Sequence, residues 1–500
     1  MLSQLSEYDT GLKPLLIDSD RSLNYEQLES LSSQLAEYLL SNNVRLLALY
    51  ADNSSNWFVV DAACQLANVC IVPLPTFFSH TQLQHIFETT AIDAIISMDS
   101  GIFEVLLKDA VIDKKETPLP GFCLLKVQTD CSWNDIPEGT GKITFTSGST
   151  GKPKGVCLSN TQLLNQANQL CKTLQLHNAR HLCLLPLSTL LENVAGIYTA
   201  LLSGGQVFVP KLEEIGFEGS STIDINKFTA IITTVEPQTI ILTPQLLVAL
   251  VSSVEAGWLA PESLKFVAVG GSRVSEGLLK KAQHCGIPAF EGYGLSECAS
   301  VVSLNTPTDN NLLSSGKVLP HLAVEIVNGE IVIAGNGMLG YVGDHNSWNQ
   351  DKIYSGDLGE FDKQGYLYIK GRKKNLLISS FGRNINPEWV ESELLSKPAI
   401  AECILFGDAR PYCSALISPR AQHMTDKQLQ KLIDEVNTEL PDYAQVKGWA
   451  RLPQRLSAQQ GLLTENGRPR RKAIQKYYRE LIESLYVEND IGEDIKVISA

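Results

Sequence analysis

Short apolar runs alternate with amphipathic helical patterns from residue 23 to beyond residue 300. Two strand-like runs (44–51 and 70–75) enclose one helical pattern (56–67). An earlier helical pattern is marked by leucines at helical spacing: Leu23, Leu28, Leu31, Leu35 and Leu39. Because such alternation is typical of strands joined by crossover helices, it predicts a layered α/β fold with substantial parallel sheet.

The sequence changes character near residue 355, which predicts a second domain. Turn-forming residues recur at short intervals there, and a helix is expected to open at Asn386-Pro387. A chain of 500 residues also exceeds the usual size of one core. We therefore predict a large N-terminal α/β domain (1–373) and a small C-terminal α+β domain (374–500) that ends in a loose, acidic tail.

Composition and charge exclude several classes of protein. The formal net charge of −14 excludes general nucleic-acid binding, because phosphate backbones require a basic face. No apolar run approaches the roughly 18 residues that a membrane helix needs, and the start of the chain lacks the charge pattern of a signal peptide. The eleven cysteines show neither CxxC nor zinc-finger spacing, which predicts buried, reduced thiols in a cytoplasmic protein.

The stretch ITFTSGSTGKPKGV is rich in glycine, lysine and hydroxyl residues and carries the strongest functional signal. A Walker phosphate loop needs GxxxxGK followed by Ser or Thr, whereas here Pro153 follows Lys152 and cannot donate an amide. The stretch instead predicts a flexible turn between two strands (142–146 and 155–158). Successive glycine and serine amides can form an anion-binding concavity, to which Lys152 or Lys154 adds positive charge.

Residues Thr146 to Val156 resemble the signature of the AMP-forming, adenylate-forming superfamily, which contains acyl-CoA synthetases, non-ribosomal peptide adenylation domains and luciferases. The resemblance extends from LNYEQL near residue 23 to RPRRKAI near residue 470. It implies that the turn closes over the β- and γ-phosphates of ATP and stays mobile so that pyrophosphate can leave. The phosphate-binding residues that it implies are Thr146, Ser147, Gly148, Ser149, Thr150, Gly151, Lys152 and Lys154.

A glycine turn after a buried strand and a YGxSE segment are the next matches to the superfamily. In the superfamily the turn approaches the adenine ring, and the flat face of Tyr293 can stack on that ring. By the same resemblance Ser296 takes the place of a threonine near the α-phosphate, and Glu297 helps to bind Mg²⁺. The adenine-side residues assigned in this way are Gly270, Gly271, Ser272, Glu291, Gly292, Tyr293 and Gly294.

The segment YSGDLGEF matches the ribose site of the superfamily. Asp357 corresponds to the aspartate whose carboxylate accepts hydrogen bonds from both ribose hydroxyls, and Arg372 corresponds to the arginine that assists there. Close by, residues 335–340 (GNGMLG) satisfy the GxGxxG pattern of dinucleotide sites. We reject a dinucleotide site, because the residues that follow have no helical apolar period.

The small domain is expected to supply a catalytic residue and a second set of contacts. The superfamily's catalytic lysine is replaced by Arg468, which keeps the charge and can clamp a carboxylate or phosphate with two bonds. Lys374 matches the hinge between the two domains. The resemblance assigns catalysis to Thr146, Ser296, Glu297 and Arg468, and the pantetheine tunnel to Ser379, Ser380, Phe381 and Gly382.

The acid-binding pocket is expected in the segment LPLSTLLENVAG. Amino-acid-activating relatives have an aspartate there that pairs with the substrate's amine, and this chain has no acid in that place. A buried ammonium without a partner is costly, so an amino acid is disfavoured, although the direction of Glu192 is left open. A fatty or similarly apolar acid is favoured, in a pocket formed by Ser188, Thr189, Leu190, Val194 and Ala195.

Three functions remain open at this stage. An acyl-CoA synthetase is favoured, which uses ATP and Mg²⁺ to form an acyl-adenylate and passes the acyl group to CoA. The alternatives are an acyl-AMP ligase that loads the phosphopantetheine of an acyl carrier protein, and a non-catalytic nucleotide or acyl binder. Six basic residues lie close together near the C-terminus: Arg468, Arg470, Arg471, Lys472, Lys476 and Arg479. This basic cluster is either a solvated helix face or a binding site for CoA phosphates or an acidic carrier protein.

Overall fold

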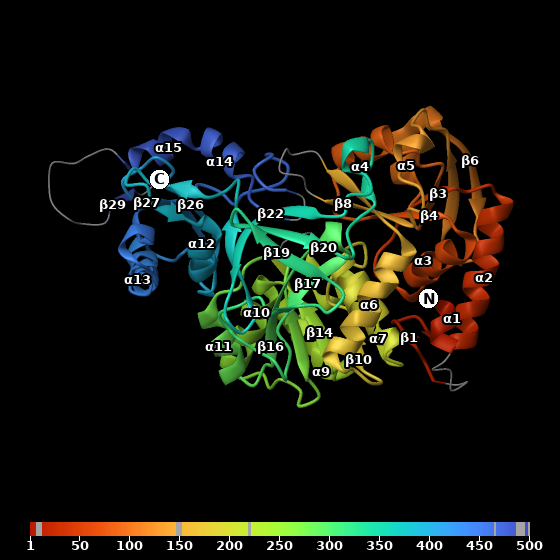
Figure 1. Ribbon diagram of the computed structural model, residues 1–500, viewed down its shortest axis with the longest axis horizontal. Helices are drawn as coiled ribbons and strands as arrows, with labels where there is room; N and C mark the ends of the chain where they lie inside the picture. Colours follow the sequence, from red (N-terminus) through yellow and green to blue (C-terminus); the bar gives the residue numbers. More distant parts are fainter. Residues whose placement is uncertain (7–12, 147–152, 219–221, 465–466, 487–495, 499–500) are drawn as a thin grey trace.

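The computed structural model describes residues 1–6, 13–146, 153–218, 222–464, 467–486 and 496–498. Figure 1 shows a large N-terminal part, built from two extended sheets with helices between and around them, and a smaller C-terminal part beside it. This is the layered α/β architecture with parallel sheet that the sequence predicts. No helix in the described ranges is both long and apolar enough to span a bilayer.

The first sheet of the large part contains the alternation seen near the N-terminus. Its described strands run in the order β21-β9-β8-β4-β3-β5-β7-β6. The central strands β8, β4, β3 and β5 are parallel, and the outer strands pair antiparallel. In that order their bounds are Gly340–Tyr341, Lys154–Leu158, Lys142–Thr146, Cys70–Leu74, Leu46–Tyr50, Ala94–Ser97, Cys123–Val127 and Val111–Glu116.

The second sheet runs in the order β18-β17-β16-β15-β14-β10-β11-β1-β2 over the described residues. Strands β16 to β1 are parallel in this order, whereas β17, β18 and β2 join antiparallel at the edges. The bounds are Lys317–Val318, Ser300–Leu304, Ala289–Leu295, Phe266–Val269, Thr239–Leu242, Arg180–Leu182, Gln206–Phe208, Leu16–Ile17 and Ser22–Leu23. The parallel strands end at one edge, where their loops can form a site.

Helices fill the space between the two sheets and cover their outer faces. The largest apolar cluster joins residues of both sheets to α3, α6 and the π-helix η4, and a second cluster packs α9, α10 and α11 against β14 and β15. The bounds are α1 (Leu2–Leu5), α2 (Tyr25–Ser41), α3 (Ser55–Ala67), α4 (His80–Thr89), α5 (Gly101–Leu107), α6 (Asn160–Leu174), η4 (Leu191–Tyr198), α7 (Thr199–Leu202), α8 (Leu212–Ile215), α9 (Ile225–Val235), α10 (Pro244–Glu255) and α11 (Glu276–His284).

A third sheet leads from the large part into the small one. It is an antiparallel meander of β19 (Ala323–Val327), β20 (Glu330–Ala334), β22 (Ile353–Phe361) and β23 (Leu367–Arg372). No helix opens at residues 335–340, because β20 is followed by the strand β21 (Gly340–Tyr341), so the rejection of a dinucleotide site there is confirmed. The small part has its own sheet, β26-β27-β28-β29, and its own apolar clusters.

The small part contains both strands and helices, as expected of an α+β domain, and its last strand lies in the stretch predicted to be a loose tail. Its strands are β24 (Leu377–Ile378), β25 (Asn384–Ile385), β26 (Ile400–Phe406), β27 (Cys413–Pro419), β28 (Val446–Arg451) and β29 (Lys496–Ile498), and its helices are α12 (Pro387–Leu395), α13 (Asp426–Asn437), α14 (Arg471–Tyr477) and α15 (Arg479–Ser484). Because β29 pairs parallel with β28, the prediction of a loose tail is wrong for residues 496–498.

Side-chain hydrogen bonds cap the first turns of α2 and α12, where the sequence predicts that helices begin. The Asn24 side chain accepts a hydrogen bond from the amide of Gln27 at the start of α2, and a capping box is completed by Gln27. Asn386 caps α12, with Pro387 at the first helical position.

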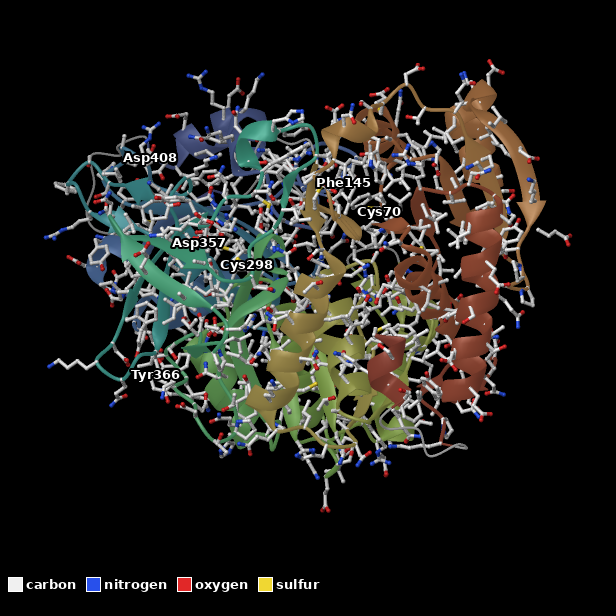
Figure 2. All side chains as sticks on the ribbon, turned by 45° about the vertical axis from the view of Figure 1, so that its right-hand side comes forward. Cys70, Phe145, Cys298, Asp357, Tyr366 and Asp408 are labelled. Carbon is white, nitrogen blue, oxygen red and sulfur yellow. The ribbon has the colours of Figure 1, made fainter. Side chains whose placement is uncertain are left out.

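All eleven cysteines are free thiols and most are buried, including Cys70 and Cys298, which are labelled in Figure 2. The prediction of reduced, mostly buried thiols is therefore consistent with the structure.

A buried ion pair ties β8, α3 and η4 together inside the large part. The Lys142 and Asp61 side chains are 1% and 0% exposed, and Nζ of Lys142 lies 2.9 Å from Oδ1 of Asp61. Lys142 also donates to Oδ1 of Asn193 at 2.5 Å, and the Tyr198 hydroxyl donates to Oδ2 of Asp61 at 2.5 Å. Each charge is thus neutralised and hydrogen-bonded, which is the condition for burying an ion pair without a large penalty.

We expect Lys142→Met to lower the free energy of unfolding by about 3–5 kcal/mol, because it leaves Asp61 charged and buried without its cation. Urea denaturation of the purified protein measures this change. The double variant Lys142→Met with Asp61→Leu is expected to recover much of the loss, since it removes both charges. Lys114→Ala, which removes an exposed ion pair with Glu104, serves as the control and should leave the midpoint unchanged. A single variant as stable as the wild type would contradict the argument.

Candidate functional site

The predicted turn lies between β8 and β9, which form an antiparallel hairpin. Thr146 at the end of β8 pairs with Lys154 at the start of β9, so the two strands are confirmed. The hairpin therefore places Thr146 and Lys154 side by side at the base of the turn. The assignments of Ser147, Gly148, Ser149, Thr150, Gly151 and Lys152 lie outside the described residues.

Lys154 and Glu297 meet at Tyr341. The Lys154 ammonium lies 4.8 Å from the centre of the Tyr341 ring, and the Tyr341 hydroxyl donates to Oε1 of Glu297 at 2.7 Å. Glu297 lies on the turn η5 (Ser296–Cys298), directly after β16. Its second carboxylate oxygen has no partner among the described residues, which suits a hard cation that takes one or two carboxylates and keeps its waters. The sequence analysis missed Tyr341, whose single signal was its place after the GxGxxG segment.

Asp357 joins the second sheet to the third. Oδ2 of Asp357 accepts a hydrogen bond from the Tyr293 hydroxyl on β16 at 2.7 Å, and Oδ1 lies 2.8 Å from Nε of Arg372 on β23. Burial raises the pKa of Asp357, and the Arg372 charge and the Tyr293 hydrogen bond lower it. A carboxylate offers about four lone-pair positions. Two positions therefore remain for the two hydroxyls of a ribose.

The protein's own packing and backbone require glycine at some positions of this region but not at others. A Cβ on Gly294 would lie 1.7 Å from the carbonyl oxygen of Ser300, so the close pairing of β16 with β17 demands glycine there. Gly271 has φ +86°, which also favours glycine. A Cβ on Gly270 would meet only ordinary contacts, the nearest being the carbonyl oxygen of Gly292 at 3.6 Å. The protein's own packing therefore does not require glycine at position 270, where the sequence predicts that the adenine approaches.

The carboxyl group of Glu291 lies near the segment that follows the glycine turn. Its surroundings are largely protein, and Arg273 is the charged group that acts on it most strongly. Desolvation raises the pKa of Glu291 to about 8, although the Arg273 charge lowers it. Glu291 therefore has a structural reason to be present whether or not it contacts a nucleotide, and its assignment to the nucleotide stays a prediction.

Arg468 reaches the glycine turn from the small part of the chain. Its Nη2 donates to the carbonyl oxygen of Gly271 at 2.7 Å. Although part of its surface is exposed, desolvation lowers the pKa of Arg468, as does Arg372, whereas Asp357 and Glu297 raise it. The structure thus brings Arg468, Asp357 and Glu297 into one electrostatic cluster, as expected if these residues act on one ligand.

The predicted acid pocket lies around the start of η4. Ser188 and Thr189 are half-buried in the preceding loop, and the Thr189 hydroxyl donates to the carbonyl oxygen of Pro186. Leu190 and Val194 are buried in the main apolar cluster, and Ala195 packs against both large clusters. Leu190 and Val194 are thus buried, whereas Ser188, Thr189 and Ala195 are partly exposed.

The structure settles the direction of Glu192. The side chain is fully buried, and its Oε1 lies 2.7 Å from Nε2 of His181. Its Oε2 accepts hydrogen bonds from the backbone amides of Leu184 and Leu185. Glu192 therefore points into the protein and is not available to pair with a substrate ammonium. His181, Cys183 and Glu192 together have metal-binding atom types within 4.8 Å, but the hydrogen bonds of His181 and Glu192 already account for their burial.

The hinge and pantetheine residues lie on the chain that enters the small part. Lys374 follows β23 and is exposed. Ser379, Ser380, Phe381 and Gly382 form the tip of the β24–β25 hairpin, and the Phe381 side chain is 76% exposed. Within the described residues, the backbone of this tip bonds to Arg383 and Arg410. Among the described residues, the tip forms no hydrogen bond or ion pair with Asp357, Arg372 or Arg468, and its role stays a prediction.

The basic cluster near the C-terminus divides into two groups. Arg471 is held inside the small part, where it forms two hydrogen bonds to Glu391 at 2.7 and 2.9 Å. By contrast Lys472, Lys476 and Arg479 are exposed and line one hollow of about 360 Å³ on α14 and α15. The expectation of a single basic surface is therefore wrong for Arg471, whose charge is needed to neutralise a buried carboxylate.

Comparison with known proteins agrees with this geometry. The model of the AMP-binding enzyme family matches residues 7–342, and the model of the AMP-binding enzyme C-terminal domain matches residues 374–490. The chain is 28% identical over 428 residues to 2-succinylbenzoate–CoA ligase of Bacillus subtilis, which covers 78% of this chain and 81% of that protein. It is 23% identical over 425 residues to a long-chain-fatty-acid–CoA ligase of Mycobacterium bovis, covering 69% of each chain.

A solved structure shows the same fold over almost the whole length. It is the O-succinylbenzoate coenzyme A synthetase of Bacillus subtilis in complex with ATP and magnesium ion, with a TM-score of 0.73, 23% identity, and coverage of 94% of this chain and 98% of that chain. The family model alone matches well over half of the 500 residues. The sequence resemblance is thereby confirmed, and this chain belongs to the AMP-binding enzyme family.

Proposed function

We propose that the protein uses ATP to convert a carboxylic acid into an acyl-adenylate and then transfers the acyl group to the thiol of CoA. The observation that carries this proposal is the convergence of Tyr293, Asp357 and Arg372 with Arg468, which reaches the glycine turn from the other part of the chain. Tyr293, Asp357 and Arg372 suit a ribose. Arg468 brings positive charge to the place where the α-phosphate of ATP would lie. The names of the relatives support the same class of reaction.

The first half-reaction joins an acid oxygen to the α-phosphorus and breaks its bond to pyrophosphate. Asp357 would hold the ribose, so that the α-phosphate faces Thr146, Ser296 and Arg468. Nη2 of Arg468 is anchored on Gly271, and its other N–H groups remain to meet negative charge as it develops. Glu297 would hold Mg²⁺, which neutralises phosphate charge when bound. Arginine can thereby take the role that lysine has in the superfamily.

The second half-reaction breaks the acyl–phosphate bond and forms a thioester, releasing AMP. We assign the domains as residues 1–373 and 374–500, with Lys374 as the hinge. Rotation about this hinge would carry the hairpin tip of Ser379, Ser380, Phe381 and Gly382 to the acyl-adenylate. The exposure of Phe381 supports this assignment, because a large apolar side chain held in water is available to pack against pantetheine.

The substrate is proposed to be an uncharged, apolar acid, and a fatty acid is our first choice. Glu192 is committed to His181 and to two backbone amides, so its carboxylate is not available to an ammonium group. Leu190 and Ala195 supply an apolar wall instead. The relatives act on acids as different as succinylbenzoate and long-chain fatty acids, so they support the acid class alone.

A carrier protein is the second candidate for the thiol acceptor. The observation that favours it is the basic hollow of Lys472, Lys476 and Arg479, in a chain whose net charge is −14. A local positive surface on an acidic protein attracts a partner with an acidic face. CoA remains our first proposal, because it is the acceptor named for the relatives.

Pyrophosphate exchange tests the proposed function directly. The purified protein is given ATP, Mg²⁺ and a panel of fatty, aromatic and amino acids, and incorporation of labelled pyrophosphate into ATP is measured. We expect exchange with apolar acids and none with amino acids. Addition of CoA should then yield a thioester, whereas a thioester formed only on a phosphopantetheine-bearing carrier protein would select the second candidate. Absence of exchange with every acid, despite ATP binding, would leave a non-catalytic binder.

Asp357→Asn is expected to raise KM for ATP by roughly 10–100-fold, because hydrogen bonds to a charged acceptor contribute about 1.5–3 kcal/mol. Initial rates of exchange at varied ATP concentration measure the effect. Glu360→Gln is the matched control, since Glu360 lies on the same strand but pairs with Lys370 at the surface. An unchanged KM in Asp357→Asn would place the ribose elsewhere.

Arg468→Ala is expected to lower kcat of exchange by about a hundredfold, because a positive group that meets the developing phosphate charge is removed. Arg468→Lys should keep or raise the rate, since lysine has this role in the superfamily. Lys447→Ala, on an exposed position of the same part, provides the control. An inactive Arg468→Lys would show that the anchor on Gly271 specifically requires arginine.

A further inference from the structure

The segment 338–342 connects the first sheet to the second sheet close to Glu297. On one side, the backbone amide of Val342 donates to the carbonyl oxygen of Gly155 on β9 at 2.9 Å. On the other side, the backbone amide of Met338 donates to the carbonyl oxygen of Glu297 on η5 at 2.7 Å. The segment therefore ties the strand that follows the predicted phosphate turn to the turn that carries Glu297.

Tyr341 lies within this segment, and its place does not depend on its hydroxyl group. It pairs with Val156 where β21 joins β9. Its amide donates to Oγ of Ser347 at 2.8 Å, and its carbonyl oxygen accepts from Nε1 of Trp348 at 2.9 Å. The preceding Gly340 has φ +147°, and a Cβ there would clash with the Trp348 ring. Backbone contacts thus hold the Tyr341 ring in place, so the hydroxyl is not required for the local fold.

The Tyr341 side chain contacts two opposite charges. Its hydroxyl donates to Oε1 of Glu297 at 2.7 Å, and the Lys154 ammonium lies 4.8 Å from the centre of its ring. A hydrogen bond to a carboxylate is strengthened by the charge of the acceptor. The face of an aromatic ring attracts a cation through its quadrupole. One phenol side chain therefore serves both charged groups, each through a different part of the ring.

The hydroxyl hydrogen bond distinguishes the two oxygens of Glu297. Oε1 accepts from Tyr341, whereas Oε2 forms no hydrogen bond or ion pair with any described residue. The bond restricts rotation of the carboxylate, so Oε2 is presented in one orientation. Carboxylates that ligate a metal are usually hydrogen-bonded in turn, and removal of such a partner lowers metal affinity by roughly 10–100-fold. The arrangement fits a divalent cation that takes one carboxylate oxygen and keeps its waters.

We propose that Tyr341 is a positioning residue that orients Glu297 for Mg²⁺ through its hydroxyl and holds Lys154 for the phosphates of ATP through its ring. This role rests on the proposed function, in which Glu297 would hold Mg²⁺. Tyr341 acts through these two residues and does not itself contact the reacting atoms. The simpler alternative is that Tyr341 only packs at the edge of the first sheet, in which case nucleotide affinity does not depend on its hydroxyl.

Nucleotide binding, measured without turnover, separates the two contacts. Calorimetry gives the Kd of α,β-methylene-ATP, an analogue that cannot release pyrophosphate, with Mg²⁺ and with a chelator instead. In Tyr341→Phe, which keeps the ring, we expect Kd with Mg²⁺ to rise roughly tenfold, while Kd without Mg²⁺ stays at the wild-type value. In Tyr341→Leu, Kd without Mg²⁺ should also rise, by roughly threefold, because Lys154 has lost its ring.

Tyr38→Phe is the matched control. It also removes a tyrosine hydroxyl from the large part, one that donates to the carbonyl oxygen of Glu116 on β6, at the opposite edge of the first sheet. Both Kd values should equal those of the wild type. If Tyr341→Leu does not fold, Tyr341→Phe decides the role of the hydroxyl, and Lys154→Gln should then reproduce the threefold rise without Mg²⁺.

The outcomes for Tyr341 and for the proposed function can be told apart. If the wild type catalyses no pyrophosphate exchange, the proposed function fails, whereas the binding measurement still decides the role of Tyr341. Three results would overturn the proposal: a wild-type Kd with Mg²⁺ in Tyr341→Phe, an equal rise of Kd with and without Mg²⁺ in that variant, or a wild-type Kd that does not respond to Mg²⁺. An unchanged Kd without Mg²⁺ in folded Tyr341→Leu would overturn the part assigned to Lys154.

Discussion

The buried charge of Lys142 determines how two functional segments of the large part are arranged. Lys142 begins β8, whose other end, Thr146, is the base of the predicted phosphate turn. Its ion pair with Asp61 and its hydrogen bond to Asn193 fix that strand against α3 and η4. Because an unpaired charge in this place would cost several kcal/mol, the three elements cannot shift independently. Thr146, the base of the predicted phosphate turn, and the predicted acid pocket at the start of η4 are thereby held in one frame.

The nucleotide end of the site depends on a second charge, that of Asp357. Tyr293 approaches it from the second sheet and Arg372 from the third, so one carboxylate joins the two sheets at this edge. Burial raises the pKa of Asp357, and Arg372 opposes that shift. The side chain is therefore oriented before any ligand arrives, which reduces the entropy lost on binding.

The sequence predicted the parts of the site whose geometry is local. The β8–β9 hairpin, the cap at Asn386 and the order of the motifs follow from turn chemistry and periodicity. The direction of Glu192 could not be predicted, because η4 is a π-helix whose side chains depart from the 3.6-residue period. The burial of Arg471 was also missed, since its partner Glu391 is 80 residues away in the sequence. Long-range pairing of charges leaves no periodic signal.

The use of arginine at position 468 has a geometric reason in this chain. A lysine ammonium concentrates its three donors at one point, so a lysine here would give up the Gly271 carbonyl when it binds phosphate, with no loss in the chemical step. A guanidinium spreads its donors over a planar fork, and Arg468 can keep Nη2 on Gly271 while other N–H groups remain available. The small part is then held at the glycine turn by Arg468. Closure would depend less on the ligand's own contacts, and opening for the second half-reaction would require that Arg468 release Gly271.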